Sequence, residues 1–103
     1  MLVALPGDYG KPRPALVVQV DALTADDCGS VVVCPLTTHL TGAASFRVAV
    51  EPTQGNGLHI RSEIMVEKLA GVARARLREV IGQLDRAAMT AVDRALLLVL
   101  GFA

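Results

Sequence analysis

Residues 11–20 read KPRPALVVQV, with Arg13 between two prolines and directly before an apolar, β-branched run. Each proline fixes its own φ at about −65° and pushes the preceding residue towards extended geometry. Arg13 therefore lies on a stiff, extended approach to a predicted strand. Two interpretations stay open from this stretch alone. Either the prolines only start an edge strand and Arg13 points into water, or Arg13 meets a phosphate in a fixed geometry.

The composition predicts one small aliphatic domain spanning residues 1–103. Hydrophobic residues make up 52% of the chain, and the only aromatic residues are Tyr9, Phe46 and Phe102. So few aromatics argue against a sheet that stacks RNA bases. The apolar content is more than a lone small domain hides comfortably, so an apolar interface between subunits is expected.

Charge and cysteine usage exclude several classes of protein. The net charge is zero, which is unlike a general polyanion binder, so any contact with nucleic acid must be local. Cys28 and Cys34 match no metal-binding or redox spacing, and Cys34 reads as a small core residue. We expect no metal and no cofactor. The sequence shows no signal peptide and no apolar run of membrane length, so a soluble, cytoplasmic protein is expected.

The pattern along the chain predicts short strands with glycine-rich turns, followed by one helix. Pro35 is expected to mark a bulge or the end of its strand. The prediction is a mainly β fold with helices (α+β), in which a helix packs on a small barrel or a strongly bent antiparallel sheet. The predicted strands cover residues 1–5, 15–20, 30–36, 45–50, 62–69 and 79–84, with a helical turn at 73–77 and a helix at 86–100.

The terminal helix has the clearest signals. Asp85 is a good N-cap residue, and Gly101 is a natural stop. Residues at helical spacing form one apolar face, while residues 96–100 are apolar all round. That end must be covered by the sheet or by a second subunit.

Several separate motifs stand out from about residue 7 to the end: GDYGKPRPALVVQ at 7–19, CPLTT at 34–38, NGL at 56–58, S-x-x-MVEK at 62–68, VIGQLD at 80–85 and VDRAL at 92–96. Together they resemble the MazF/PemK (Kid) toxins of bacterial toxin–antitoxin modules. The resemblance implies an SH3-like barrel with a C-terminal helix, of the kind shared with CcdB. It also implies a homodimer that cuts single-stranded mRNA without metal, leaving 2′,3′-cyclic phosphate and 5′-hydroxyl ends.

The resemblance places the family's catalytic arginine on Arg13 and its threonine on Thr37. The chemistry of the side chains agrees with these roles. A guanidinium forms a rigid fork that suits phosphate, and a hydroxyl at the end of a strand is a fixed donor. Such groups stabilise charge in a transition state without a metal ion. Arginine is a poor general base, so a nearby carboxylate or His39 would be a more conventional one.

Further residues are expected to contact RNA. The resemblance places Tyr9 and Lys11 in the loop that borders the family's substrate channel, where Tyr9 could stack on a base. Thr38 and His39 follow Thr37, although each also fits an ordinary turn. Ser62 is another candidate, although it could instead cap a turn. Glu67 is the last candidate; the family usually has aspartate there, and a surface ion pair with Lys68 is the alternative. His59 lies in another turn and is assigned no role.

Two other functions stay open at the level of the sequence. A CcdB-like toxin shares the fold but binds DNA gyrase without catalysis, and it would not need Arg13 and Thr37. A degenerate toxin would only bind its antitoxin. The resemblance implies a MazE/PemI-like antitoxin, whose acidic, initially disordered C-terminal tail would compete with RNA phosphate for Arg13.

Overall fold

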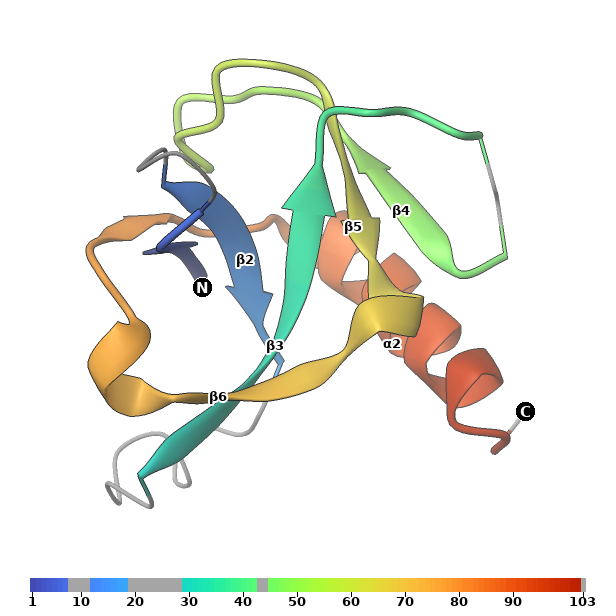
Figure 1. Cartoon of the computed structure of the whole chain (residues 1–103). Helices are drawn as coiled ribbons and strands as arrows, with labels where there is room; N and C mark the ends of the chain where they lie inside the picture. The colour runs from blue at the N-terminus through green and yellow to red at the C-terminus, as the bar shows by residue number, and fades with distance from the viewer. Residues whose placement is uncertain (8–11, 19–28, 43–44, 103) are drawn as a thin grey trace.

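The computed structural model describes residues 1–7, 12–18, 29–42 and 45–102 (Figure 1). This part of the chain contains a seven-stranded sheet, in which all pairs are antiparallel, and a helix near the carboxyl end. Two short 3-10 turns flank β6: η2 (Val66–Lys68) and η3 (Arg74–Arg76). The strands are β1 (Leu2–Leu5), β2 (Arg13–Val17), β3 (Ser30–Thr37), β4 (Arg47–Val50), β5 (Ser62–Met65), β6 (Ala70–Ala73) and β7 (Val80–Gly82), and the helix is α2 (Arg86–Val99).

Strand β3 pairs with three other strands. β2 lies along one of its sides, while β6 and β5 share the other side, β6 opposite residues 30–33 and β5 opposite residues 36–37. Pro35 lies between the part of β3 that pairs with β6 and the part that pairs with β5. Proline has no backbone N–H, so at this position no hydrogen bond to either strand is lost. Ile64 faces Leu36 and Ala70 faces Val33, so the connection is three residues longer than a regular ladder needs. Those residues turn out of the sheet as η2.

This arrangement corrects several predicted boundaries. The strand expected at 62–69 ends at Met65, because η2 interrupts it, and β6 was not predicted. Pro35 does not end its strand, which continues to Thr37. β2 begins at Arg13, two residues before the predicted start, and its predicted end at 19–20 lies outside the described residues. The strands expected at 45–50 and 79–84 shorten to β4 and β7, whereas the helical turn expected at 73–77 is confirmed by η3.

The sheet is bent and open rather than a closed barrel. The strand order is β4-β5-β3-β2-β1-β7, and no pairing among the described strands joins β4 to β7. The loop after β4 instead contacts the end of β7. Gln83 N, directly after β7, donates to Gly55 O in that loop at 3.0 Å. Figure 1 shows α2 behind β4 and β5, and α2 contacts β4 and η2. The predicted fold, a bent antiparallel sheet with a C-terminal helix, is confirmed.

The two faces of β2 and β3 carry two separate apolar clusters. Leu16 and Cys34 belong to the cluster that α2 covers, whereas Val17 and Val33 belong to the cluster on the opposite face. Neighbouring residues of a strand point to opposite faces, so a strand buried on both faces must be apolar throughout. This explains why the segment after Pro14 reads as an uninterrupted apolar run rather than as alternation.

Helix α2 begins and ends as its sequence predicts. The carboxylate of Asp85 accepts a hydrogen bond from Ala88 N at 2.8 Å. Gly101 has a φ of 81°, and Phe102 N donates to Leu97 O at 2.8 Å, which closes the last turn. Val92 and Ala95 are buried, while Leu97, Leu98, Leu100 and Phe102 are exposed in the single chain. In the described part of the chain, no helix has the length and apolar character to cross a membrane.

A close backbone approach at Gly57 gives a testable prediction. Gly57 has a φ of +69°, and a methyl group added there would lie 2.4 Å from the carbonyl oxygen of Ile81 in β7. We expect Gly57→Ala to lower the free energy of unfolding by about 2 kcal/mol or more, because strain and a clash act together. Gly71→Ala is the matched control, since a methyl group there meets open space. Equal urea denaturation curves for the two variants would contradict this account.

Candidate functional site

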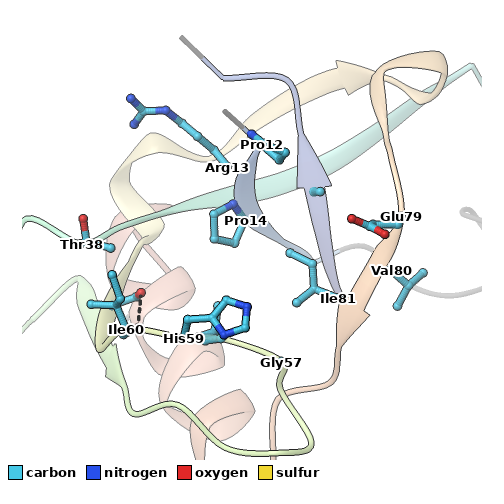
Figure 2. A pocket seen from close by; sticks show the side chains of 13 residues that line it. Pro12, Arg13, Pro14, Thr38, Gly57, His59, Ile60, Glu79, Val80 and Ile81 are labelled. Atoms are coloured by element: carbon cyan, nitrogen blue, oxygen red, sulfur yellow. Dashed lines mark hydrogen bonds between the residues drawn. The ribbon is translucent and has the colours of Figure 1, made fainter. Parts of the chain in front are cut away.

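An open groove of about 570 Å³ crosses the sheet where the amino end of β2 faces the loop before β5 (Figure 2). We call it the Arg13 groove. Its walls come from segments far apart in the sequence, and this size is typical of ligand sites. The lining residues are Ala4, Pro12, Arg13, Pro14, Thr38, Gly57, Leu58, His59, Ile60, Ser62, Glu79, Val80 and Ile81.

The proline-flanked arginine stands on the wall of this groove. Arg13 is exposed, opens β2 and pairs with Leu5 of β1. Figure 2 shows the guanidinium extending away from the ring of Pro14 and from the imidazole of His59. The strand pairing and the two prolines hold its backbone, so the fork is presented from a stiff base. The backbone at Arg13 is therefore stiff, and contact of its guanidinium with a phosphate stays a prediction.

The two threonines after β3 are used differently. Thr37 is half-buried, and its hydroxyl oxygen accepts a hydrogen bond from His39 N at 3.1 Å, so it caps the turn that begins there. Thr38 is exposed and lines the Arg13 groove. His39 is exposed and is not among the lining residues. Of the two threonines, Thr38 is therefore the one that lines the groove, and Thr37 precedes it in the sequence.

The NGL motif and Ser62 shape the opposite wall. Asn56 is buried, with its side-chain amide donating to Glu51 O at 2.8 Å and its side-chain oxygen accepting from Leu58 N at 3.0 Å. The hydroxyl of Ser62 donates to Ile60 O at 2.9 Å, the dashed line in Figure 2. Ser62 therefore caps a turn, one of the two possibilities that its sequence left open. It also lines the groove, and its contact with RNA stays a prediction.

Glu67 does not line the groove. It lies in η2, where its carboxylate accepts from Arg47 Nε at 2.9 and 3.1 Å, and Arg47 Nη2 completes a two-pronged contact. This pair lowers the pKa of Glu67, because the guanidinium favours the ionised carboxylate. Its ion-pair partner is Arg47 of β4, rather than the neighbouring Lys68.

Sequence reasoning missed a buried carboxylate. Glu63 in β5 is only 5% exposed, and its two oxygens accept from Thr41 N at 3.2 Å and from Gly42 N at 3.0 Å. The Thr41 hydroxyl at 3.2 Å and Arg47 Nη1 at 3.5 Å add to these bonds. Hydrogen bonds from Gly42 and Thr41 lower the pKa of Glu63, against the effect of its burial. The sequence signal was available, since Glu63 lies inside a predicted strand, directly before the apolar residues Ile64 and Met65.

His59 and Glu79 are also groove residues that the sequence reasoning did not select. Both lie in turns or at a strand edge, where local sequence gives no sign of which surface they face. Tyr9 and Lys11, expected at the site, lie outside the described residues. Within the described ranges, no three His, Cys, Asp or Glu side chains are grouped to hold a metal ion.

Cys34 is a core residue, as predicted. It is fully buried in the cluster that α2 covers. Burial, with a smaller effect of the Glu67 charge, raises the pKa of its thiol to about 11. The thiol is therefore protonated at neutral pH and is not a nucleophile.

Known proteins resemble this chain over nearly its whole length. Residues 1–100 match the family described as PemK-like, MazF-like toxin of type II toxin–antitoxin system. A protein of Mycolicibacterium smegmatis named probable endoribonuclease MazF is 43% identical over 94 residues, covering 91% of this chain and 84% of that protein.

Solved structures share the fold. Mycobacterium tuberculosis toxin MazF-mt6 superposes with a TM-score of 0.83 at 24% identity, covering 99% of this chain and 97% of that one. A chain in a crystal structure of MazE-MazF from Deinococcus radiodurans gives a TM-score of 0.80 at 25% identity, covering 99% of this chain and 92% of that one.

The buried carboxylate makes stability depend on acid pH. The pKa of Glu63 is lower in the folded than in the unfolded chain, so its contribution is complete above the unfolded value, about 4.3. We expect the free energy of unfolding to fall as pH drops below that value. In Glu63→Gln, stability at pH 7 is lower and the decline in acid is shallower, measured by urea denaturation from pH 7 to pH 3. An unchanged acid slope in the variant would contradict this assignment.

Proposed function

The chain belongs to the family of PemK-like, MazF-like toxins of type II toxin–antitoxin systems, and we propose that it cuts single-stranded mRNA in the Arg13 groove. Its relative at 43% identity is named an endoribonuclease, and RNA cleavage is the activity of this chain. One observation carries the choice of site: the arginine that the motif selects lines an open groove, and Thr38 lines the same groove.

The proposed reaction uses the RNA's own 2′-hydroxyl. Its oxygen attacks the neighbouring phosphorus while a base takes its proton, the bond from phosphorus to the 5′-oxygen breaks, and that oxygen gains a proton. The products are a 2′,3′-cyclic phosphate and a 5′-hydroxyl, with no metal ion required. Arg13 would bind the non-bridging oxygens, where charge grows in the transition state.

The threonines would position the phosphate. We keep Thr37 as the residue implied by the family motif, with its hydroxyl oxygen holding His39 N and so fixing the backbone that carries Thr38. The Thr38 hydroxyl lies on the groove wall and can donate to a phosphate oxygen. Of the described groove residues, His59 and Glu79 have side chains that can exchange a proton with the substrate.

RNA cleavage is favoured over the two other functions. The family match and the relative named as an endoribonuclease support an enzyme rather than a gyrase-binding toxin. Arg13, held by two prolines in a groove, can also stabilise the charge on a phosphate during cleavage. Gyrase binding does not need such a group. The same placement argues against a toxin that has lost its site.

The proposal includes partners and location. The exposed apolar end of α2 supports a homodimer, because Leu97, Leu98 and Phe102 are otherwise left in water. A MazE/PemI-like antitoxin with an acidic tail would occupy the Arg13 groove in place of RNA. We treat residues 1–103 as one domain, since the family match spans 1–100, and we place its action on mRNA in the cytoplasm.

The chemistry of cleavage is tested with a defined single-stranded RNA. We expect cutting to continue in EDTA, to give 2′,3′-cyclic phosphate ends by mass spectrometry, and to stop when the residue 5′ to the cut carries a 2′-deoxyribose. Reproducible cleavage that EDTA abolishes would contradict the proposed mechanism.

Arg13→Ala tests the position of the site. The side chain is exposed, so its removal opens no core cavity, and stability should change by less than about 1 kcal/mol. The cleavage rate should fall about 10²- to 10³-fold, because a donor to the transition state is lost. Arg13→Lys should restore little, since a point charge lacks the two-pronged fork. A variant that cuts at the wild-type rate would place catalysis elsewhere, and one that unfolds would make Arg13 structural.

A further inference from the structure

The carboxylate of Glu63 holds a segment that it does not belong to. It lies on β5, yet its oxygens bind the amides of Thr41 and Gly42, in the segment that follows β3. The Thr41 hydroxyl is a further donor. Burying a carboxylate is costly unless donors surround it, so these contacts must form together whenever Glu63 is buried.

The other end of that segment is fixed at the same rung of the sheet. Thr37 and Glu63 are partners in the β3–β5 pairing. The hydroxyl oxygen of Thr37 accepts from His39 N, so the chain turns directly after the strand. Residues 38–42 are therefore tied at both ends to one strand pair, and their described side chains at 38–41 are exposed.

Arg47 forms an ion pair with Glu63. Arg47 Nη1 lies 3.5 Å from Glu63, while its remaining donors grip Glu67. Only 13% of the Arg47 side chain is exposed, so the arginine is locked between two carboxylates. The negative charge of Glu63 is thereby satisfied by donors inside the protein. Glu63 is not among the residues that line the groove.

We propose that Glu63 is a positioning residue for RNA cleavage, which fixes residues 38–42 so that Thr38 meets the RNA phosphate in one arrangement. This inference rests on the proposed function of the Arg13 groove. Catalysis is sensitive to displacements of about 1 Å, which can cost up to about 100-fold in rate. If residues 38–42 were mobile, the groove would still admit RNA, but Thr38 would not be held in the position that the phosphate needs.

The experiment compares Glu63→Ala and Glu63→Gln with the wild type. The matched control is Glu51→Gln, which removes another carboxylate paired with an arginine, Arg61 at 2.8 Å, with both side chains more than half exposed. Two quantities are measured: hydrogen exchange of the Thr41 and Gly42 amides by NMR, and kcat and KM on one RNA oligonucleotide.

We expect Glu63→Ala to speed exchange of both amides at least about tenfold and to lower kcat about 10- to 100-fold, with KM changing less than about threefold. Glu63→Gln keeps one acceptor oxygen and should be intermediate on both measures. Glu51→Gln should match the wild type. If Glu63→Ala does not fold, Glu63→Gln, which keeps the side-chain volume, gives the same comparison.

The outcomes separate this inference from the proposed function. If the variants exchange faster but retain the wild-type kcat, Glu63 is structural only and the inference is overturned. Unchanged exchange would overturn it as well, because the contacts would not hold the segment. A wild-type protein that cuts no RNA, although its Thr41 and Gly42 amides are protected, would overturn the proposed function and, with it, the catalytic role of Glu63.

Discussion

The whole structure depends on one strand that serves three partners. β3 binds β2 along one side, and along the other it binds first β6 and then β5. Pro35 marks the change, since a residue without an N–H suits the gap between two ladders. β2 and β3 run antiparallel with Ala15 opposite Pro35, so the carboxyl end of β3 lies beside the start of β2. Thr38 and Arg13 line one groove there. Figure 1 shows β3 running from β6 at one end to β5 at the other.

Local signals were enough to predict much of the fold. The N-cap at Asp85 and the glycine stop at Gly101 set the bounds of α2, because both depend on hydrogen bonds to nearby residues. The uninterrupted apolar run after Pro14 marked a strand, and the two buried faces of β2 explain it. What failed was the segment from 62 to 73. One strand was predicted over 62–69, but it ends at Met65. η2 lies where β3 changes its partner from β6 to β5, a long-range feature that local sequence does not reveal.

The candidate site shows the same contrast between residues with a local sequence signal and residues placed by long-range contacts. Arg13 could be selected as a candidate because the two prolines beside it in the sequence indicate a rigid backbone. His59 and Glu79 could not, since each reaches the groove through the folding of segments that no local pattern relates. Glu63 was overlooked because its partners, Thr41 and Gly42, lie about twenty residues away in sequence. In the proposed site, two prolines stiffen the backbone of Arg13, and the buried carboxylate of Glu63 binds the segment that carries Thr38.

The central claim is that RNA lies in the Arg13 groove, and NMR mapping with an uncleavable RNA tests it most directly. A single-stranded oligonucleotide with 2′-O-methyl groups binds without reacting, since the attacking hydroxyl is blocked. The account predicts that the amide shifts of Arg13, Thr38, His59 and Glu79 change together in the titration. Shifts confined to the second hollow, about 380 Å³ between β4 and the start of α2, with those four amides unmoved, would contradict it.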